Sequence, residues 1–209
     1  MRISDARYSR DMRRYQLAWR FIQLGARTRT VQRWSGLSMY RVRTLYEAYS
    51  GSAESPQRGV APHQVSFFWR SAQLRSEAAV LAGFLAAFGA FPTGTGPKAA
   101  GALESVERGE RLCRAYEEFK ACWPETQSTL EHTILLLGEL VRNVEIALNR
   151  CMDCDILIVV DRLSVAPPRC AFCRHERQVG RAYQAAAAKT ANAAEEQDEA
   201  QAAVQGRLF

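Results

Sequence analysis

Residues 151–173 read CMDCDILIVVDRLSVAPPRCAFC and contain four of the six cysteines of the chain. The cysteines form two C-x2-C pairs that are separated by fifteen residues. Each pair places two sulfurs on one tight turn, and two such turns can complete a tetrahedral cage around one metal ion. The β-branched run at residues 156–160 predicts a short strand, and the prolines at positions 167 and 168 turn the chain back. We therefore expect one structural Zn²⁺ per chain, bound by the thiolates of Cys151, Cys154, Cys170 and Cys173.

Other uses of the four cysteines are less consistent with their spacing. A thioredoxin-like redox site needs a single C-x2-C pair, and haem attachment needs a histidine directly after the second cysteine, whereas Arg174 separates Cys173 from His175. An iron–sulfur cluster stays open as an alternative, because four cysteines also ligate such clusters. The sequence contains no visible secretory signal and no apolar run of membrane-spanning length. We therefore predict a cytoplasmic protein without a membrane segment and with reduced thiols, in which Cys113 and Cys122 are plain buried thiols.

The remainder of the sequence predicts a mainly α-helical protein. Apolar residues recur at helical spacing over residues 28–34, 39–49, 65–88, 102–121 and 126–149. The stripe on the last of these helices is wider than that of a surface helix, so the helix is expected to be central or covered by a partner. The predicted organisation is a basic helical arm and helix-turn-helix-like hairpin with a linker over residues 1–64, a helical core or partner-binding region over 65–149, a small four-cysteine, zinc-ribbon-like module over 150–180, and an Ala-rich, disordered tail over 181–209.

Positive charge is concentrated in the N-terminal part of the chain. The formal net charge is +6, and all but three of the 28 basic residues are arginine, which suits bidentate contacts with phosphates and base edges. Within residues 28–49, Gly36 lies at a turn between two short helices, and apolar residues occupy the positions that pack a helix-turn-helix. A glutamine at position 32 replaces the small residue that such a motif usually carries. An ordinary helical hairpin with a solvated charged face is the alternative interpretation.

The hairpin interpretation assigns a role to each side of its second helix. Val42, Leu45, Tyr46 and Tyr49 are expected to face inward. On the outward face, Tyr40, Arg41, Arg43 and Thr44 are the candidate DNA-binding residues, near enough to the start of the helix to reach base edges. Arg10, Arg13 and Arg14, on the basic arm, are the candidates for contacts with phosphates.

Three parts of the sequence resemble the FlhC family of flagellar transcriptional activators. They are FIQLGARTRTVQRWSGLSMYRVRTLYEAYSG at residues 21–51, SPQRGVAP at residues 55–62, and the two cysteine pairs. The resemblance covers about residues 15–180, whereas APHQVSFFWRSAQ at residues 61–73, the Arg-rich arm and the Ala-rich tail depart from the family pattern, as in a diverged paralogue.

The resemblance implies a function that composition alone does not indicate. Members of the family are not enzymes. They act with an FlhD-type subunit, as four FlhD and two FlhC chains, bind promoter DNA upstream of flagellar operons and recruit RNA polymerase. The four cysteines carry over as the family's zinc ligands.

The sequence also lacks the residue patterns that are typical of a catalytic site. The three histidines, His63, His132 and His175, are far apart in the sequence, and TGTGPK at residues 93–98 lacks the spacing of a phosphate-binding loop. We therefore expect a non-enzymatic, DNA-binding transcriptional activator. The alternative is a regulatory subunit that has a structural zinc site, binds other proteins and does not contact DNA.

Overall fold

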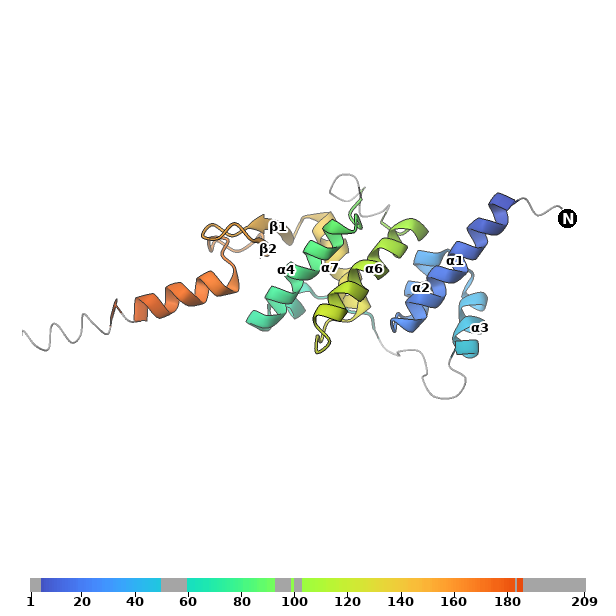
Figure 1. Ribbon diagram of the computed structural model, residues 1–209, viewed down its shortest axis with the longest axis horizontal. Coiled ribbons are helices and arrows are strands. Elements are labelled where there is room, and N and C mark those ends of the chain that lie inside the picture. Colours follow the sequence, from blue (N-terminus) through green and yellow to red (C-terminus); the bar gives the residue numbers. More distant parts are fainter. Residues whose placement is uncertain (1–4, 50–59, 93–98, 100–102, 183, 186–209) are drawn as a thin grey trace, which may run out of the picture. The chain divides into compact units, whose positions relative to one another are not determined.

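The computed structural model describes residues 5–49, 60–92, 99, 103–182 and 184–185. The chain forms two compact units, Met1–Pro168 and Arg169–Phe209. The protein is mainly helical, as the sequence predicts, and its described residues also form one small antiparallel sheet (Figure 1). The elements of the first unit are α1 (Asp5–Gln23), α2 (Thr28–Ser35), α3 (Met39–Tyr49), the 3-10 helix η1 (Val65–Trp69), α4 (Ala72–Ala87), α6 (Val106–Cys122), α7 (Leu130–Arg142), β1 (Ile146–Arg150) and β2 (Leu157–Asp161).

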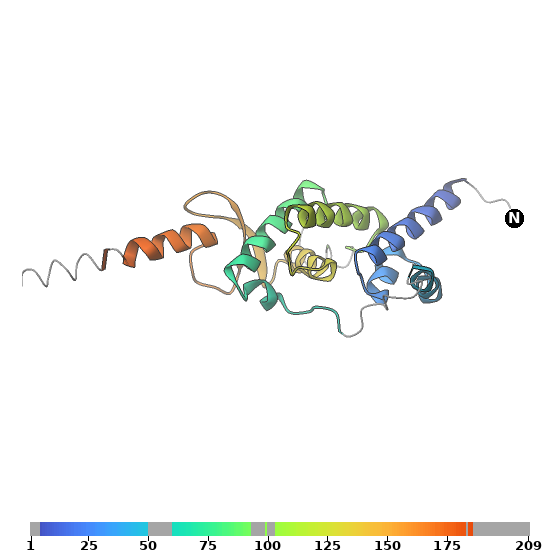
Figure 2. The ribbon, with the colours of Figure 1, turned by 60° about the horizontal axis from the view of Figure 1, so that its bottom comes forward.

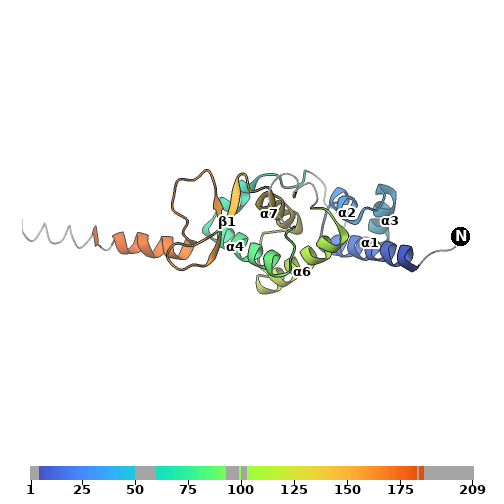
Figure 3. The same cartoon turned by 90° about the horizontal axis from the view of Figure 1, so that it is seen from above.

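The first three helices pack against one another. Gly25 follows α1 and Gly36 follows α2. Both adopt positive φ values, 75° and 67°, a conformation that favours glycine after the end of a helix. Phe21 of α1 and Trp34 of α2 pack with ring centroids 5.9 Å apart in the shared core. Leu37, in the turn between α2 and α3, is buried in the same core. The three helices therefore form one packed group, which Figure 3 shows from above.

A second group of helices, α4, α6 and α7, forms the centre of this unit (Figure 2). Each of these helices begins at a serine or threonine whose side-chain oxygen accepts a backbone N–H bond, namely Ser71, Ser105 and Thr129. The wide apolar stripe of α7 is buried within the chain, since α4, α6, η1 and β1 all pack on this helix. Its breadth therefore reflects a central position.

The predicted helix over residues 126–149 is wrong at both ends. α7 begins at Leu130 and stops at Arg142, because Asn143 adopts the left-handed conformation with φ of 55°. The following residues form β1, in which Ile146 is buried and Leu148 is exposed. Short apolar runs of this kind fit a helical and a strand period equally well. The predicted strand at residues 156–160 is confirmed within one residue as β2, which pairs with β1 so that Leu148 lies opposite Val159.

Two further boundaries differ from the prediction. The helix expected over residues 65–88 is divided into η1 and α4, because the side chain of Ser71 caps a new helix. In the second unit, residues 171–182 are helical, so the helix passes beyond position 181, where the disordered tail was expected to begin. Most of the linker at 50–64 and of the tail lies outside the described residues.

Helices α1 and α6 approach each other closely at a glycine. A Cβ atom at Gly109 would lie 2.7 Å from Cδ2 of Leu17, so only glycine admits that leucine without displacement. Two arginine–glutamate pairs flank the contact. Arg13 donates two hydrogen bonds to Glu110, of 3.0 and 2.6 Å, and Arg20 forms the same bidentate pair with Glu117 one heptad further along both helices. These contacts fix the first helical group on the second.

No helix in the described residues combines the length and the apolar character needed to cross a membrane.

Candidate metal centre and nucleic-acid interface

The first cysteine pair lies in the turn of the β1–β2 hairpin. Cys151 directly follows β1, and its N–H donates a 2.9 Å hydrogen bond to the carbonyl of Ile156, just before β2. The carbonyl of Cys151 accepts a 2.9 Å bond from the N–H of Asp155, whose φ of 58° closes the turn. Strand pairing therefore holds the turn that presents Cys151 and Cys154.

The second pair lies at the beginning of the helix that spans residues 171–182. The N–H of Cys173 donates a 3.3 Å hydrogen bond to Sγ of Cys170, and the N–H of Arg174 donates a 3.1 Å bond to the carbonyl of Cys170. The pair is therefore held as a compact turn with one sulfur already accepting a backbone bond.

The ligand atoms of Cys151, Cys154, Cys170 and Cys173 all lie within 4.8 Å of one another. A tetrahedral site with Zn–S distances of about 2.3 Å has sulfurs about 3.8 Å apart, so a small adjustment would close the cage. No disulfide joins these four residues, and four soft thiolates suit zinc or an iron–sulfur cluster. The predicted ligand set is thus brought together, and its donor atoms fit such a metal.

The other two cysteines differ from each other. Cys113 is buried, as predicted, and burial raises the pKa of its thiol to about 12, which makes it unreactive. The prediction that Cys122 is buried is wrong, because this last residue of α6 is exposed. Neither belongs to the cysteine cluster.

Helix α3 presents the predicted DNA-binding residues on its outer side. Tyr40 is 80% exposed, and Arg41, Arg43 and Thr44 are also exposed. Among the described residues no hydrogen bond or ion pair engages the side chain of Arg43, whereas the guanidinium of Arg41 lies 5.9 Å from the centre of a tyrosine ring on α1. Arg43 is therefore the arginine of this face with the greatest freedom to contact a ligand.

The opposite side of α3 anchors the helix. Val42 is buried, and the hydroxyl of the buried Tyr46 donates a hydrogen bond to the carbonyl of Ala26. Burial raises the pKa of Tyr46, so its hydroxyl stays protonated as a donor. Leu45 is half-buried, while Tyr49 is exposed rather than inward-facing and meets Trp19 edge-on, with centroids 5.1 Å apart.

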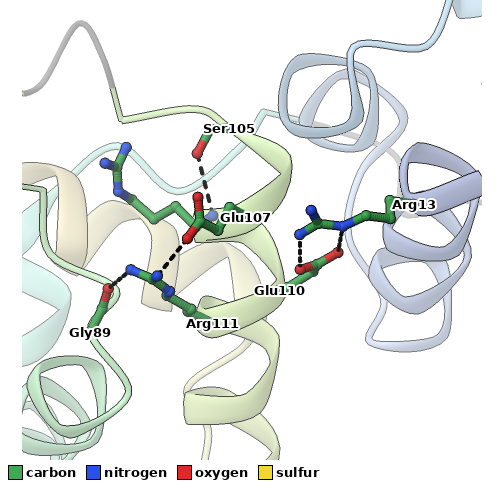
Figure 4. A network of polar contacts seen from close by, with 7 residues as sticks. Arg13, Gly89, Ser105, Glu107, Glu110 and Arg111 are labelled. Carbon is green, nitrogen blue, oxygen red and sulfur yellow. Dashed lines mark hydrogen bonds and ion pairs between the residues drawn. The ribbon is translucent and has the colours of Figure 1, made fainter. Parts of the chain in front are cut away.

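The three arginines predicted on the basic arm have different surroundings in helix α1. Arg10 is exposed. Arg13 reaches across to Glu110 of α6, which raises the pKa of its guanidinium through that hydrogen bond (Figure 4). Arg14 lies 3.7 Å from a carboxylate oxygen of Asp11, and its guanidinium lies beside the turn at Gly36. Arg13 therefore has a structural partner, and Arg14 lies closest to the α2–α3 turn.

Sequence reasoning missed the carboxylate that holds the start of α2. Glu131 of α7 is only 5% exposed, and its Oε1 accepts a 2.7 Å hydrogen bond from the N–H of Arg27, the N-cap residue of α2. Its Oε2 accepts a 3.0 Å bond from the hydroxyl of Thr30. The side chain of Arg27 provides no cap of its own, so Glu131 supplies the capping carboxylate from another helix. No local pattern marks this contact, because the partners are 104 residues apart.

No protein-family model matches this sequence, and the search of curated proteins gives no match.

Proposed function

We propose that this chain is a zinc-containing, DNA-binding regulatory subunit in which α3 is the recognition helix that contacts base edges. The observation that supports it most strongly is the two-sided character of that helix. Val42 and Tyr46 hold it in the core, while Tyr40, Arg41, Arg43 and Thr44 face solvent. Arginine and a neighbouring hydroxyl at the start of a helix have the reach and the donors to bind base edges in the major groove.

The local arrangement of α2 and α3 supports a helix-turn-helix role. The two helices are in contact and are joined by a three-residue connection that begins with Gly36 in the left-handed conformation. In a helix-turn-helix the second helix enters the major groove and the first crosses the backbone. Arg29 and Arg33 are exposed on α2, where they would meet phosphates in that pose, although Arg33 also pairs with Glu104.

The metal bound by the cysteine cluster is proposed to be a structural zinc ion. All four donors are protein thiolates, so a tetrahedral ion would have no open position for substrate or water. Zinc without an open coordination position stabilises folding and does not catalyse. The donor set thus agrees with a regulatory, non-enzymatic protein.

The resemblance to the FlhC family refines the proposal. In that case the chain acts in the cytoplasm with an FlhD-type subunit, as four FlhD and two FlhC chains, and activates flagellar operons by binding promoter DNA and recruiting RNA polymerase. The motif-bearing residues 21–51 overlap the end of α1, all of α2 and all of α3. The proposed reading helix is therefore part of the segment with the strongest resemblance.

Substitution of Arg43 by alanine tests the proposal. The co-expressed complex with an FlhD-type subunit would be titrated with a flagellar promoter duplex and with its scrambled sequence. The change should cost about 1–3 kcal/mol on the promoter and little on scrambled DNA. Arg114→Ala, which removes an exposed arginine from α6, is the matched control. If the Arg43 variant binds both duplexes as the wild type does, α3 is not the recognition helix.

A second candidate function is protein binding without DNA contact. The β1–β2 hairpin and the residues after it expose several large apolar side chains, namely Met152, Ile156, Leu163 and Val165. Such a cluster is typical of a surface that another protein covers. Absence of salt-dependent DNA binding, together with capture of the FlhD-type subunit, would favour this function.

A further inference from the structure

The helix over residues 171–182 is exposed over almost its whole length. Cys173 is buried, but every residue from 174 to 182 is exposed. A helix that buries no apolar stripe gains little from packing, so its persistence depends on its anchored first turn and on whatever it binds. The surface that it presents is therefore a candidate interaction surface.

The arginines of this helix lie on one side. Arg174, Arg177 and Arg181 are related by i, i+3 and i+7 spacing, which places them within an arc of about 60° at 100° per residue. The acidic Glu176 falls on the opposite side of the helix. We call these three arginines the arginine stripe. The stripe is about 10 Å long, which matches about three steps between successive phosphates of one DNA strand at about 3.4 Å per step along the axis.

The negative charge of a zinc-loaded metal centre would not cancel the positive charge at the far end of the stripe. Four thiolates and one Zn²⁺ sum to a charge of −2, which lies at the first turn of the helix. Arg181 is eight residues beyond Cys173, about 12 Å along the helix axis. That separation exceeds the Debye length of about 8 Å at physiological ionic strength. Arg181 therefore presents positive charge to an anionic partner, while Arg174 and Arg177, which lie within about 6 Å of Cys173 along the axis, contribute less.

We infer that the arginine stripe of helix 171–182 binds the phosphate backbone of duplex DNA, as a second contact that is independent of base sequence. The inference rests on the proposed DNA-binding function and adds the part of the DNA that this helix binds. Arginine forms bidentate, charge-assisted hydrogen bonds with phosphate, and contacts of this kind supply affinity without discrimination between sequences.

The test compares two double variants of the full-length chain, each in the co-expressed complex with the FlhD-type subunit, on a 30-base-pair duplex over a salt series. R177Q/R181Q removes two charges from the stripe and keeps good helix formers at both positions. R114Q/K120Q removes two exposed charges from α6 and is the control. For R177Q/R181Q, the slope of log K against log salt should become shallower by about 0.9–1.8, and promoter and scrambled duplexes should be affected alike. The control should keep the wild-type slope.

Two further measurements separate lost contacts from lost folding. R177K/R181K, which keeps both charges, should restore most of the salt dependence, and all variants should bind the same amount of metal. A wild-type slope in R177Q/R181Q, or loss of binding in R177K/R181K as complete as in the glutamine variant, overturns the inference. If that wild-type slope is accompanied by loss of binding to poly-glutamate, the stripe serves an acidic protein instead.

The same data distinguish this inference from the proposed function. If the wild type binds no duplex at low salt, both are wrong. If the wild type binds and Arg43→Ala loses discrimination while R177Q/R181Q behaves as the wild type, the reading role of α3 stands and the role of the stripe is wrong.

Discussion

Replacing Glu131 by alanine is expected to destabilise the first unit of the chain and to release the start of α2. The carboxylate is buried and accepts hydrogen bonds of 2.7 Å from the N–H of Arg27 and 3.0 Å from the hydroxyl of Thr30. Alanine removes both acceptors and leaves a gap beneath the helix start. The first turn of α2 then has no side-chain cap, because Arg27 offers none.

The magnitude follows from the two lost bonds. A hydrogen bond to a charged group contributes about 1.5–3 kcal/mol, so the two together set a range of about 3–6 kcal/mol. Arg27 and Thr30 are only half-buried, so water can form hydrogen bonds with part of the donor groups that lose the carboxylate. We therefore expect a loss of about 3 kcal/mol, the lower end of that range. Glu131→Gln keeps one acceptor oxygen and should lose about 1–2 kcal/mol.

Thermal and urea unfolding of the full-length protein measure these differences. A loss of about 3 kcal/mol corresponds to a fall in Tm of roughly 6–12 °C for a unit of this size. The matched control is Glu118→Ala, which removes an exposed glutamate from α6 and should change stability by less than about 0.5 kcal/mol. If Glu131→Ala unfolds at the same temperature as the Glu118 control, the capping argument is refuted.

Three other predictions concern the metal, the helix contact and pH. Elemental analysis should find one zinc per chain, lost in Cys154→Ser and kept in Cys113→Ser; iron with visible absorbance would instead indicate a cluster. Gly109→Ala should lower stability by about 1–3 kcal/mol, because the new methyl group crowds the facing leucine of α1. Gly83→Ala, whose methyl group would have no atom within 4 Å, should raise stability by about 0.5–1 kcal/mol. Thermal unfolding in which both variants shift stability in the same direction would contradict this. Burial, together with two nearby arginines, lowers the pKa of His132, so the unfolded chain binds that proton more tightly. Stability should therefore be complete above pH of about 6.5 and fall as the pH drops, and His132→Gln, which preserves the capping box, should flatten that part of the profile.

Several local features were predictable because their causes lie within a few residues. The start of α3 at Met39 agrees with the helical spacing over residues 39–49, and Ser38 caps it, because the N–H of Arg41 donates a 3.4 Å hydrogen bond to the hydroxyl of Ser38. The strand after the first cysteine pair followed from its β-branched run. The closeness of the sulfurs within each cysteine pair followed from spacing, because a C-x2-C turn brings its two sulfurs together whatever surrounds it.

Other features depended on where distant segments meet. A helix over residues 144–149 and strand β1 fit the same apolar residues, and pairing with β2 selects the strand. The arginines of the basic arm look equivalent in sequence, yet Glu110 engages Arg13 and leaves Arg10 exposed. The missing cap of α2 gave no signal that Glu131 would provide it.

The sequence by itself determined the two cysteine pairs, the helical character of the chain and which side of α3 carries charge, since each of these depends on spacing along a short segment. Only the tertiary structure decided which arginines are committed to glutamates and which carboxylate caps α2. The reason is physical: the free energy of a hydrogen bond or ion pair depends on the partner that packing places within about 3 Å. Partners separated by 97 and 104 residues are brought together by the burial of apolar side chains between their helices, and no pattern in either segment encodes that distance.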